Sequence, residues 1–195
     1  EDFQAAQRKY FDDFRSRGGK WLVSDFVTMG SPLAHAKLLL AKNEEEFAER
    51  IENREFPRCP PVLESNEESE KEPRFSYRPS LRDEQGKQGW HIPHHAAPFS
   101  VTRWTNLYFP VEAVLWGDFI GGPLRPVFGE GIRDLAVYVN ARKRSGFFSH
   151  TRYWKMPRDG RVPPYVVALR EALDIANQRV RAGEEMSEGQ GERSE

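Results

Sequence analysis

Apolar residues at the start of the chain recur at spacings of three and four, which predicts an amphipathic helix over residues 2–17 that packs on a sheet. The members of this stripe are Phe3, Ala6, Tyr10, Phe11 and Phe14. Gly18 and Gly19 follow, where a helix C-cap favours a residue without Cβ. A second helix is predicted over 163–181, because two prolines suit its first turn and an apolar face follows them.

Three other segments have the pattern of strands. Residues 20–29 are apolar enough for a strand that is buried on both faces, as in a parallel sheet. Residues 100–108 carry β-branched and aromatic side chains on both faces, and residues 131–140 alternate in the same way. Helices before and after these strands predict an α/β fold built on a parallel sheet with flanking helices.

The segment between the first two predicted strands is polar. Residues 57–89 are rich in Pro, Glu, Ser and Arg, and cannot bury enough apolar area to offset their ordering entropy. We therefore predict a single partial α/β domain over residues 1–181. Residues 43–97 are expected to form a long, partly disordered insertion, as a solvated loop or as a lid, and residues 182–195 a disordered tail.

Composition narrows the classes of partner. Acidic and basic residues are interspersed and the net charge is −1, so nothing indicates nucleic-acid binding. Cys59 is the only cysteine, which excludes an internal disulfide and suits a reducing compartment such as the cytoplasm. The chain has no apolar run long enough to predict a membrane span.

Ser31 is the first candidate for chemistry. It lies in a Gly-Ser-Pro-Leu turn at 30–33, after the first predicted strand, and α/β proteins place their sites at such carboxyl ends. A nucleophile elbow needs glycine two residues before and two residues after the serine, but Met29 and Leu33 occupy those positions. We therefore interpret Ser31 as part of a structural turn and not as a nucleophile.

Three clustered histidines, His91, His94 and His95, raise the question of a metal site. No carboxylate or cysteine lies nearby at ligand spacing, and flanking prolines preclude a helix that would align the rings. We predict polar or substrate-facing loop histidines, with no metal and no cofactor. A metal-dependent enzyme that uses these histidines with Asp118 is a less favoured hypothesis.

Three motifs carry a resemblance to a known family. FVTMGSPL at 26–33 resembles the strand and turn that follow the nucleophile's helix in lipase- and esterase-like α/β-hydrolases. WTNLY followed by GDFIGGPL resembles the strand and loop that deliver the catalytic acid, and HTRYW resembles the histidine loop before the final helix. The resemblance covers residues 1–40 and 98–181. It implies the C-terminal part of an α/β-hydrolase-type parallel sheet.

Carried onto this chain, the resemblance implies that Asp118 is the acid and His150 the general base. The carboxylate would fix the imidazole tautomer and stabilise the imidazolium formed when Nε2 takes the serine proton. Glu112 is the alternative acid, because it lies closer to the end of the strand. Asp118 could instead cap backbone amides of its glycine-rich turn, and His150 could simply pack among aromatic residues.

The chain contains no Gly-x-Ser-x-Gly, and the resemblance places that motif upstream of the first helix. We therefore expect part of a serine hydrolase acting on an ester or amide bond of a small-molecule or lipid-like substrate, with little activity on its own. The alternative is a degenerate, non-catalytic binding or scaffold protein of the same fold. So short a sheet would leave an edge at 20–29, which we expect a missing N-terminal half or a partner chain to cover.

Overall fold

The fold is centred on a small parallel sheet. The computed structural model describes residues 2–63, 75–77, 90, 92–111, 118–139, 149–156, 158 and 160–173. Within this part of the chain, β1 (Asp25–Met29), β4 (Arg103–Tyr108) and β5 (Arg133–Ala136) form a parallel sheet in the order β1-β4-β5. Parallel strands joined through helical segments place the protein in the α/β class, as the sequence predicts.

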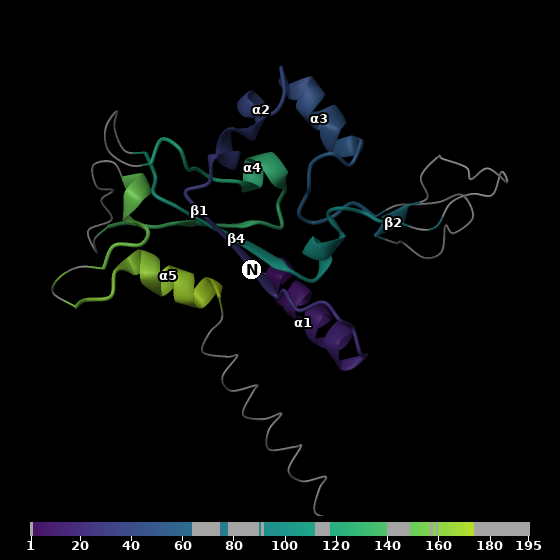
Figure 1. Ribbon diagram of the computed structural model, residues 1–195, viewed down its shortest axis with the longest axis horizontal. Coiled ribbons are helices and arrows are strands. Elements are labelled where there is room, and N and C mark those ends of the chain that lie inside the picture. Colours follow the sequence, from purple (N-terminus) through teal and green to yellow (C-terminus); the bar gives the residue numbers. More distant parts are fainter. Residues whose placement is uncertain are drawn as a thin grey trace, which may run out of the picture.

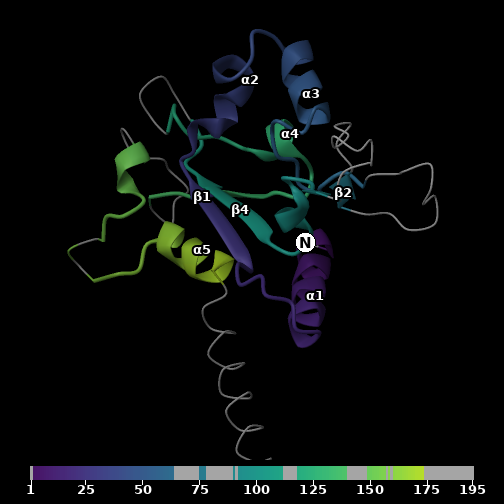
Figure 2. The ribbon, with the colours of Figure 1, turned by 45° about the vertical axis from the view of Figure 1, so that its right-hand side comes forward.

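Helices lie on both sides of these strands (Figures 1 and 2). The helices are α1 (Asp2–Ser16), α2 (Ala36–Leu39), α3 (Glu44–Glu52), α4 (Arg125–Phe128) and α5 (Pro164–Ala172). Three 3₁₀ turns, η1 (Pro32–His35), η2 (Ala97–Ser100) and η3 (Ser149–Arg152), and an antiparallel pair, β2 (Ser76–Tyr77) with β3 (Ile92–Pro93), complete the elements. In both views α2, α3 and α4 gather on one side of the strands, and α5 lies on the other.

The first strand is shorter and more exposed than its sequence indicates. Only Asp25–Met29 of the predicted 20–29 strand pairs with a neighbour. Its burial on both faces was wrongly predicted, since Leu22 is 74% exposed and Phe26 41% exposed. The reason is its place in the sheet: β1 is an edge strand, and in the described chain only β4 pairs with it. Within the described residues, the outer edge of β1 is therefore unpaired, as expected.

Helix α1 forms where predicted, but it packs through a different face. Its buried side chains are glutamines, whereas Tyr10 and Phe14 of the apolar stripe are 47% and 37% exposed. Gln7 Nε2 donates to the carbonyl oxygens of Phe99 and Thr102, at 2.6 and 3.0 Å, and Gln4 Nε2 donates to Trp104 O at 3.0 Å. The glutamines thus satisfy backbone carbonyls at the start of β4, a need that a hydrophobic pattern does not encode.

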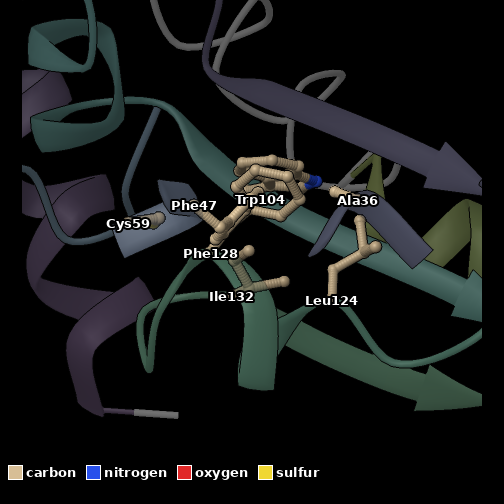
Figure 3. Close-up of a cluster of buried hydrophobic side chains, with 7 residues drawn as sticks. All are labelled: Ala36, Phe47, Cys59, Trp104, Leu124, Phe128 and Ile132. Atoms are coloured by element: carbon tan, nitrogen blue, oxygen red, sulfur yellow. The ribbon is translucent and has the colours of Figure 1, made fainter. Parts of the chain in front are cut away.

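Strand β4 is buried on both faces and divides the core in two. One cluster surrounds Trp104 (Figure 3). The centroid of the Trp104 ring lies 4.8 Å from that of Phe99, on which it stacks, and 5.7 Å from that of Phe128. Its buried members are Ala36, Phe47, Cys59, Trp104, Leu124, Phe128 and Ile132. Helices α2, α3 and α4 each contribute one of these side chains, so this cluster fixes the layer that covers one face of the sheet.

The second cluster lies on the opposite face, under α5. Its buried members are Leu107, Phe109, Val137, Tyr153, Tyr165 and Ala172. Met29 of β1 and Leu135 of β5 pack against it from the strands on either side of β4. Residues 100–108 thus bury side chains on both faces, as predicted, with Trp104 in one cluster and Leu107 in the other.

A buried ion cluster joins α1, β1 and β4 at the amino ends of the two strands. Asp25 Oδ2 accepts from Arg8 Nη2 of α1 at 2.9 Å, and Asp25 Oδ1 accepts from Arg103 Nε of β4 at 2.7 Å. The Asp25 side chain is almost fully buried. Because Asp25 and Arg103 are also register partners, the cluster fixes how β1 and β4 align.

Several sequence predictions fall partly outside the described residues. Helix α3 forms inside the predicted 43–97 insertion, and α5 accounts for the start of the predicted 163–181 helix. Residues 64–74 and 78–89 of the predicted insertion and the 182–195 tail lie outside the described ranges, so their expected disorder stays a prediction. Of the helices described, none combines the length and the apolar character that crossing a membrane requires.

Candidate functional site

The site lies at the carboxyl ends of β1 and β4. Asp118 follows β4 in the chain, and its N–H donates to Phe109 O at 3.3 Å, just beyond the last strand residue. Gly30 directly follows β1, and its N–H donates to Leu107 O at 2.9 Å. These bonds bring the turn after β1 and the loop after β4 together, where open α/β sheets place their ligands.

The Asp118 carboxylate is fully buried and is surrounded by hydrogen-bond donors. Oδ1 accepts from the N–H groups of Ile120 and Gly121 at 2.9 and 3.0 Å, and Oδ2 accepts from the Tyr153 hydroxyl at 3.1 Å. His150 Nδ1 lies 3.1 Å from both carboxylate oxygens. Asp118 therefore caps its own glycine-rich turn and also contacts His150.

His150 lies in η3, and within the described chain only its Nδ1 makes a hydrogen bond. Because a carboxylate without a proton can only accept, its bond to Nδ1 requires the proton on that nitrogen. In the neutral imidazole Nε2 then carries the lone pair. The side chain is 40% exposed, and no residue of the described chain bonds Nε2. The imidazole thus offers a proton acceptor to a reactant.

Tyr153 also belongs to this site, although the sequence indicated only a packing role for the aromatic residues near His150. Its buried hydroxyl donates to Asp118 Oδ2 and accepts from the Phe109 N–H at 3.1 Å. Burial, and after it the negative charge of Asp118, raises the pKa of this phenol above its ordinary value, so the phenol keeps its proton. The spacing HTRY, which puts Tyr153 one helical turn after His150, was the signal available for finding it.

A glycine at position 30 leaves room for this arrangement. Gly30 has φ +56°, and a Cβ there would lie 2.6 Å from the Tyr153 ring and 2.7 Å from Asp118 Oδ2. Such distances are far shorter than real Cβ contacts, and the positive φ would strain any side chain. The motif FVTMGSPL therefore contributes its glycine to the site and not its serine.

A polar network holds the loop that carries Asp118. Asn106 of β4 donates through Nδ2 to Gly122 O at 2.9 Å and to Asp134 Oδ1 at 2.7 Å. Asp134 of β5 also accepts from the N–H groups of Leu124 and Arg125, each at 2.9 Å. The loop is thereby fixed to both strands, which keeps the carboxylate in place for the imidazole.

Of the other predicted residues, Ser31 behaves as expected. Its Oγ accepts from Leu33 N at 3.3 Å and caps η1, which confirms a structural turn. Glu112, the alternative acid, lies outside the described residues. Of the two candidate acids the structure describes only Asp118, and Asp118 contacts His150.

The histidine cluster is separate from this site. His91 lies outside the described residues, and His94 and His95 stack at 4.6 Å just before β4, whereas Asp118 comes after it. His94 Nδ1 is already occupied, since it accepts from Ala96 N at 3.0 Å. In the described ranges no three His, Cys, Asp or Glu side chains are grouped so that they could hold a metal ion. His94, His95 and Asp118 are therefore not grouped in the described structure.

The fold and the site define an α/β protein with a buried carboxylate that orients a partly exposed imidazole at the carboxyl edge of a parallel sheet. Such a pair can accept a proton from a hydroxyl or a water and return it. No family model, curated protein or solved structure gives a significant match to the chain.

Proposed function

We propose that Asp118 and His150 are the acid and the general base of a serine hydrolase that cleaves an ester or amide bond. The observation that carries this proposal is the 3.1 Å contact between His150 Nδ1 and a fully buried carboxylate, at the carboxyl ends of parallel strands. The same arrangement of residue types serves acyl transfer on several unrelated folds. The proposed sheet is the C-terminal part of an α/β-hydrolase-type sheet.

The chemistry follows from the two ring nitrogens. Nε2 takes the proton of a serine hydroxyl while the serine oxygen attacks the substrate carbonyl, and Asp118 stabilises the imidazolium that forms. The imidazolium then protonates the leaving alcohol or amine as its bond to the acyl carbon breaks. A water repeats the cycle: it gives its proton to Nε2, attacks the acyl carbon and releases the carboxylic acid, and the serine recovers its proton.

The serine is proposed to come from a further parallel strand that pairs with β1. The free edge of β1 is flanked by exposed apolar side chains, namely Trp21, Leu22, Val23 and Phe26. A strand parallel to β1 on that edge would end next to Gly30, whose Cα region adjoins the His150 imidazole. A serine at the carboxyl end of such a strand would therefore lie near the His150 imidazole. A further segment of the same protein or a partner chain could supply it.

Exposed apolar residues beside the site suit an apolar acyl or alcohol group. Phe119 and Ile120 come directly after Asp118 and are both exposed. Leu38 and Leu39 at the end of α2 are also exposed, and His35 just before α2 contacts the Phe119 carbonyl through Nε2 at 3.0 Å. Apolar surface that adjoins a polar site favours small-molecule or lipid-like esters as substrates.

A fluorophosphonate probe tests this proposal, because it forms a covalent bond only with an activated serine. The natural protein, including any chain beyond these 195 residues, is expected to be labelled. His150→Ala should abolish the labelling, and Asp118→Asn should slow it by about 10⁴-fold, the cost of a wrong imidazole tautomer in such triads. His95→Ala is the matched control, since His95 is exposed and precedes β4.

The outcomes separate the enzyme from its alternative. Labelling that persists at full rate in His150→Ala contradicts the base assignment. A natural protein that is folded but never labelled favours the non-catalytic binding or scaffold protein, in which the Asp118–His150 pair would only hold η3 against β4.

A further inference from the structure

The Tyr153 hydroxyl stands between the carboxylate and the end of β4. It donates to Asp118 Oδ2 and accepts from the Phe109 N–H, both at 3.1 Å. We propose that Tyr153 is a positioning residue of the Asp118–His150 pair, which holds the carboxylate in the orientation that fixes the imidazole tautomer. This role deepens the proposed function and rests on it.

His150 contacts both carboxylate oxygens of Asp118, so the orientation of this carboxylate is what must be fixed. Nδ1 lies equally far from Oδ1 and Oδ2, so the carboxylate faces the imidazole symmetrically. On one side Ile120 and Gly121 donate to Oδ1, and on the other side Tyr153 is the donor to Oδ2. Without the phenol the donors would be unbalanced, and the carboxylate would turn toward the backbone amides.

The phenol itself has little freedom to move. Its ring packs on Phe109 with ring centroids 4.6 Å apart, and its edge meets the backbone of Gly30, which has no side chain. Tyr153 also comes directly after η3, the turn that carries His150. The rigid Tyr153 side chain therefore links the Asp118 carboxylate to the end of β4 and to the turn that carries His150.

Tyr153 is suited to donate and not to react. It is almost completely buried, and its pKa is raised by burial and by the charge of Asp118, so it stays neutral throughout the range in which a histidine works. It does not reach Nε2 of His150, where a substrate would meet the pair. A role through Asp118 is the one that its bonds support.

The test is Tyr153→Phe, which removes one oxygen and keeps the ring. In ¹⁵N-histidine-labelled protein, the wild-type His150 is expected to show the Nδ1–H tautomer with a slowly exchanging low-field Nδ1–H signal. Tyr153→Phe should give a tautomer mixture and lose that signal, as Asp118→Asn should. Tyr165→Phe is the matched control, because its hydroxyl in the same core cluster bonds the Lys155 carbonyl instead.

A purely structural role would disturb folding without a change of tautomer. If Tyr153→Phe keeps the wild-type tautomer while its backbone spectrum shows a folded protein, the proposal is overturned. Fluorotyrosine at position 153 provides a second test that keeps both ring and hydroxyl. Fluorination makes the phenol a stronger donor, so fluorotyrosine at position 153 should shift the His150 Nδ1–H signal, whereas fluorotyrosine at position 165 should leave it unchanged. If fluorotyrosine at position 153 causes no shift, the proposal is overturned.

The spectroscopic test does not depend on catalysis, so the two proposals can fail separately. If the natural protein is a hydrolase, Tyr153→Phe should lower kcat by roughly ten- to a hundredfold, the typical worth of a hydrogen bond to a charged group, with KM unchanged. If Tyr153→Phe changes the His150 tautomer as expected but the natural protein is never labelled by the probe, Tyr153 positions the pair in a protein that is not a serine hydrolase.

Discussion

Gly121 lies directly against Gly30. A Cβ on Gly121 would come within 2.6 Å of the Gly30 Cα and 2.7 Å of Asp118 Oδ2. The loop that carries the carboxylate therefore meets the turn after β1 backbone to backbone, with no space for a side chain between them. This close approach is what lets residues from two strand ends surround one carboxylate.

Gly121→Ala is expected to destabilise the protein by about 1–3 kcal/mol, the usual cost of overpacking a close contact. The added methyl group would meet backbone atoms of Gly30, which cannot move aside as a flexible side chain can. Urea unfolding measures the change. Gly122→Ala is the control, because its Cβ would meet only the Ala34 Cβ, at 3.0 Å, and should cost less. Equal costs for the two variants would contradict the Gly30–Gly121 contact.

Asp25→Ala should cost about 3–5 kcal/mol of unfolding free energy, because it removes the carboxylate shared by two mostly buried guanidinium groups, those of Arg8 and Arg103. The comparison is Asp13→Ala, which breaks the exposed pair with Arg17 and should change stability by less than about 1 kcal/mol. Both values come from chemical denaturation at neutral pH. A small effect at Asp25 would mean that the cluster does not hold α1 and β1 to β4.

Cys59 should make stability fall at alkaline pH. Burial raises the pKa of its thiol from an ordinary 9.0 to about 12, with the Gln7 amide acting weakly in the other direction. Above pH 9 the unfolded chain loses the thiol proton while the folded chain keeps it, so the unfolded state gains about 1.4 kcal/mol per pH unit.

The measurement compares wild type with Cys59→Ala between pH 8 and pH 11. The stability difference is expected to stay constant up to about pH 9 and then to shift steadily against the wild type, up to the folded pKa near 12. Parallel curves would show that the thiol ionises as readily in the folded protein as in the unfolded one.

The sequence predicts the class of fold because the strands differ strongly from the polar segment between them. It fails where tertiary position decides the outcome. Burial of β1 depends on whether a neighbour pairs with its outer edge, which the residues of β1 do not encode. Helix α1 buries Gln4 and Gln7 because carbonyl groups at the start of β4 need hydrogen-bond donors. An apolar periodicity does not predict such a requirement.

The contact between Asp118 and His150 could be anticipated because both residues lie in motifs with an expected order along an α/β sheet. The contact of Tyr153 with Asp118 could not be anticipated, because a tyrosine among other aromatic residues is most simply interpreted as a core residue. Its hydroxyl gains a role only once the fold brings Phe109 and Asp118 to it. Sequence motifs thus located the Asp118–His150 pair but missed the tyrosine that hydrogen-bonds to the carboxylate.

The pairing of β1 with β4 has a kinetic consequence. Asp25 and Arg103 are 78 positions apart, whereas β4 and β5 pair residues such as Asn106 and Asp134, which are 28 apart. Closing the longer loop costs more chain entropy, so β4 and β5 are expected to associate before β1 joins them. Each doubling of the long connection adds only about 0.6 kcal/mol to that cost. Related chains can therefore lengthen or shorten this connection with little loss of stability, and they would differ mainly in how fast the sheet closes.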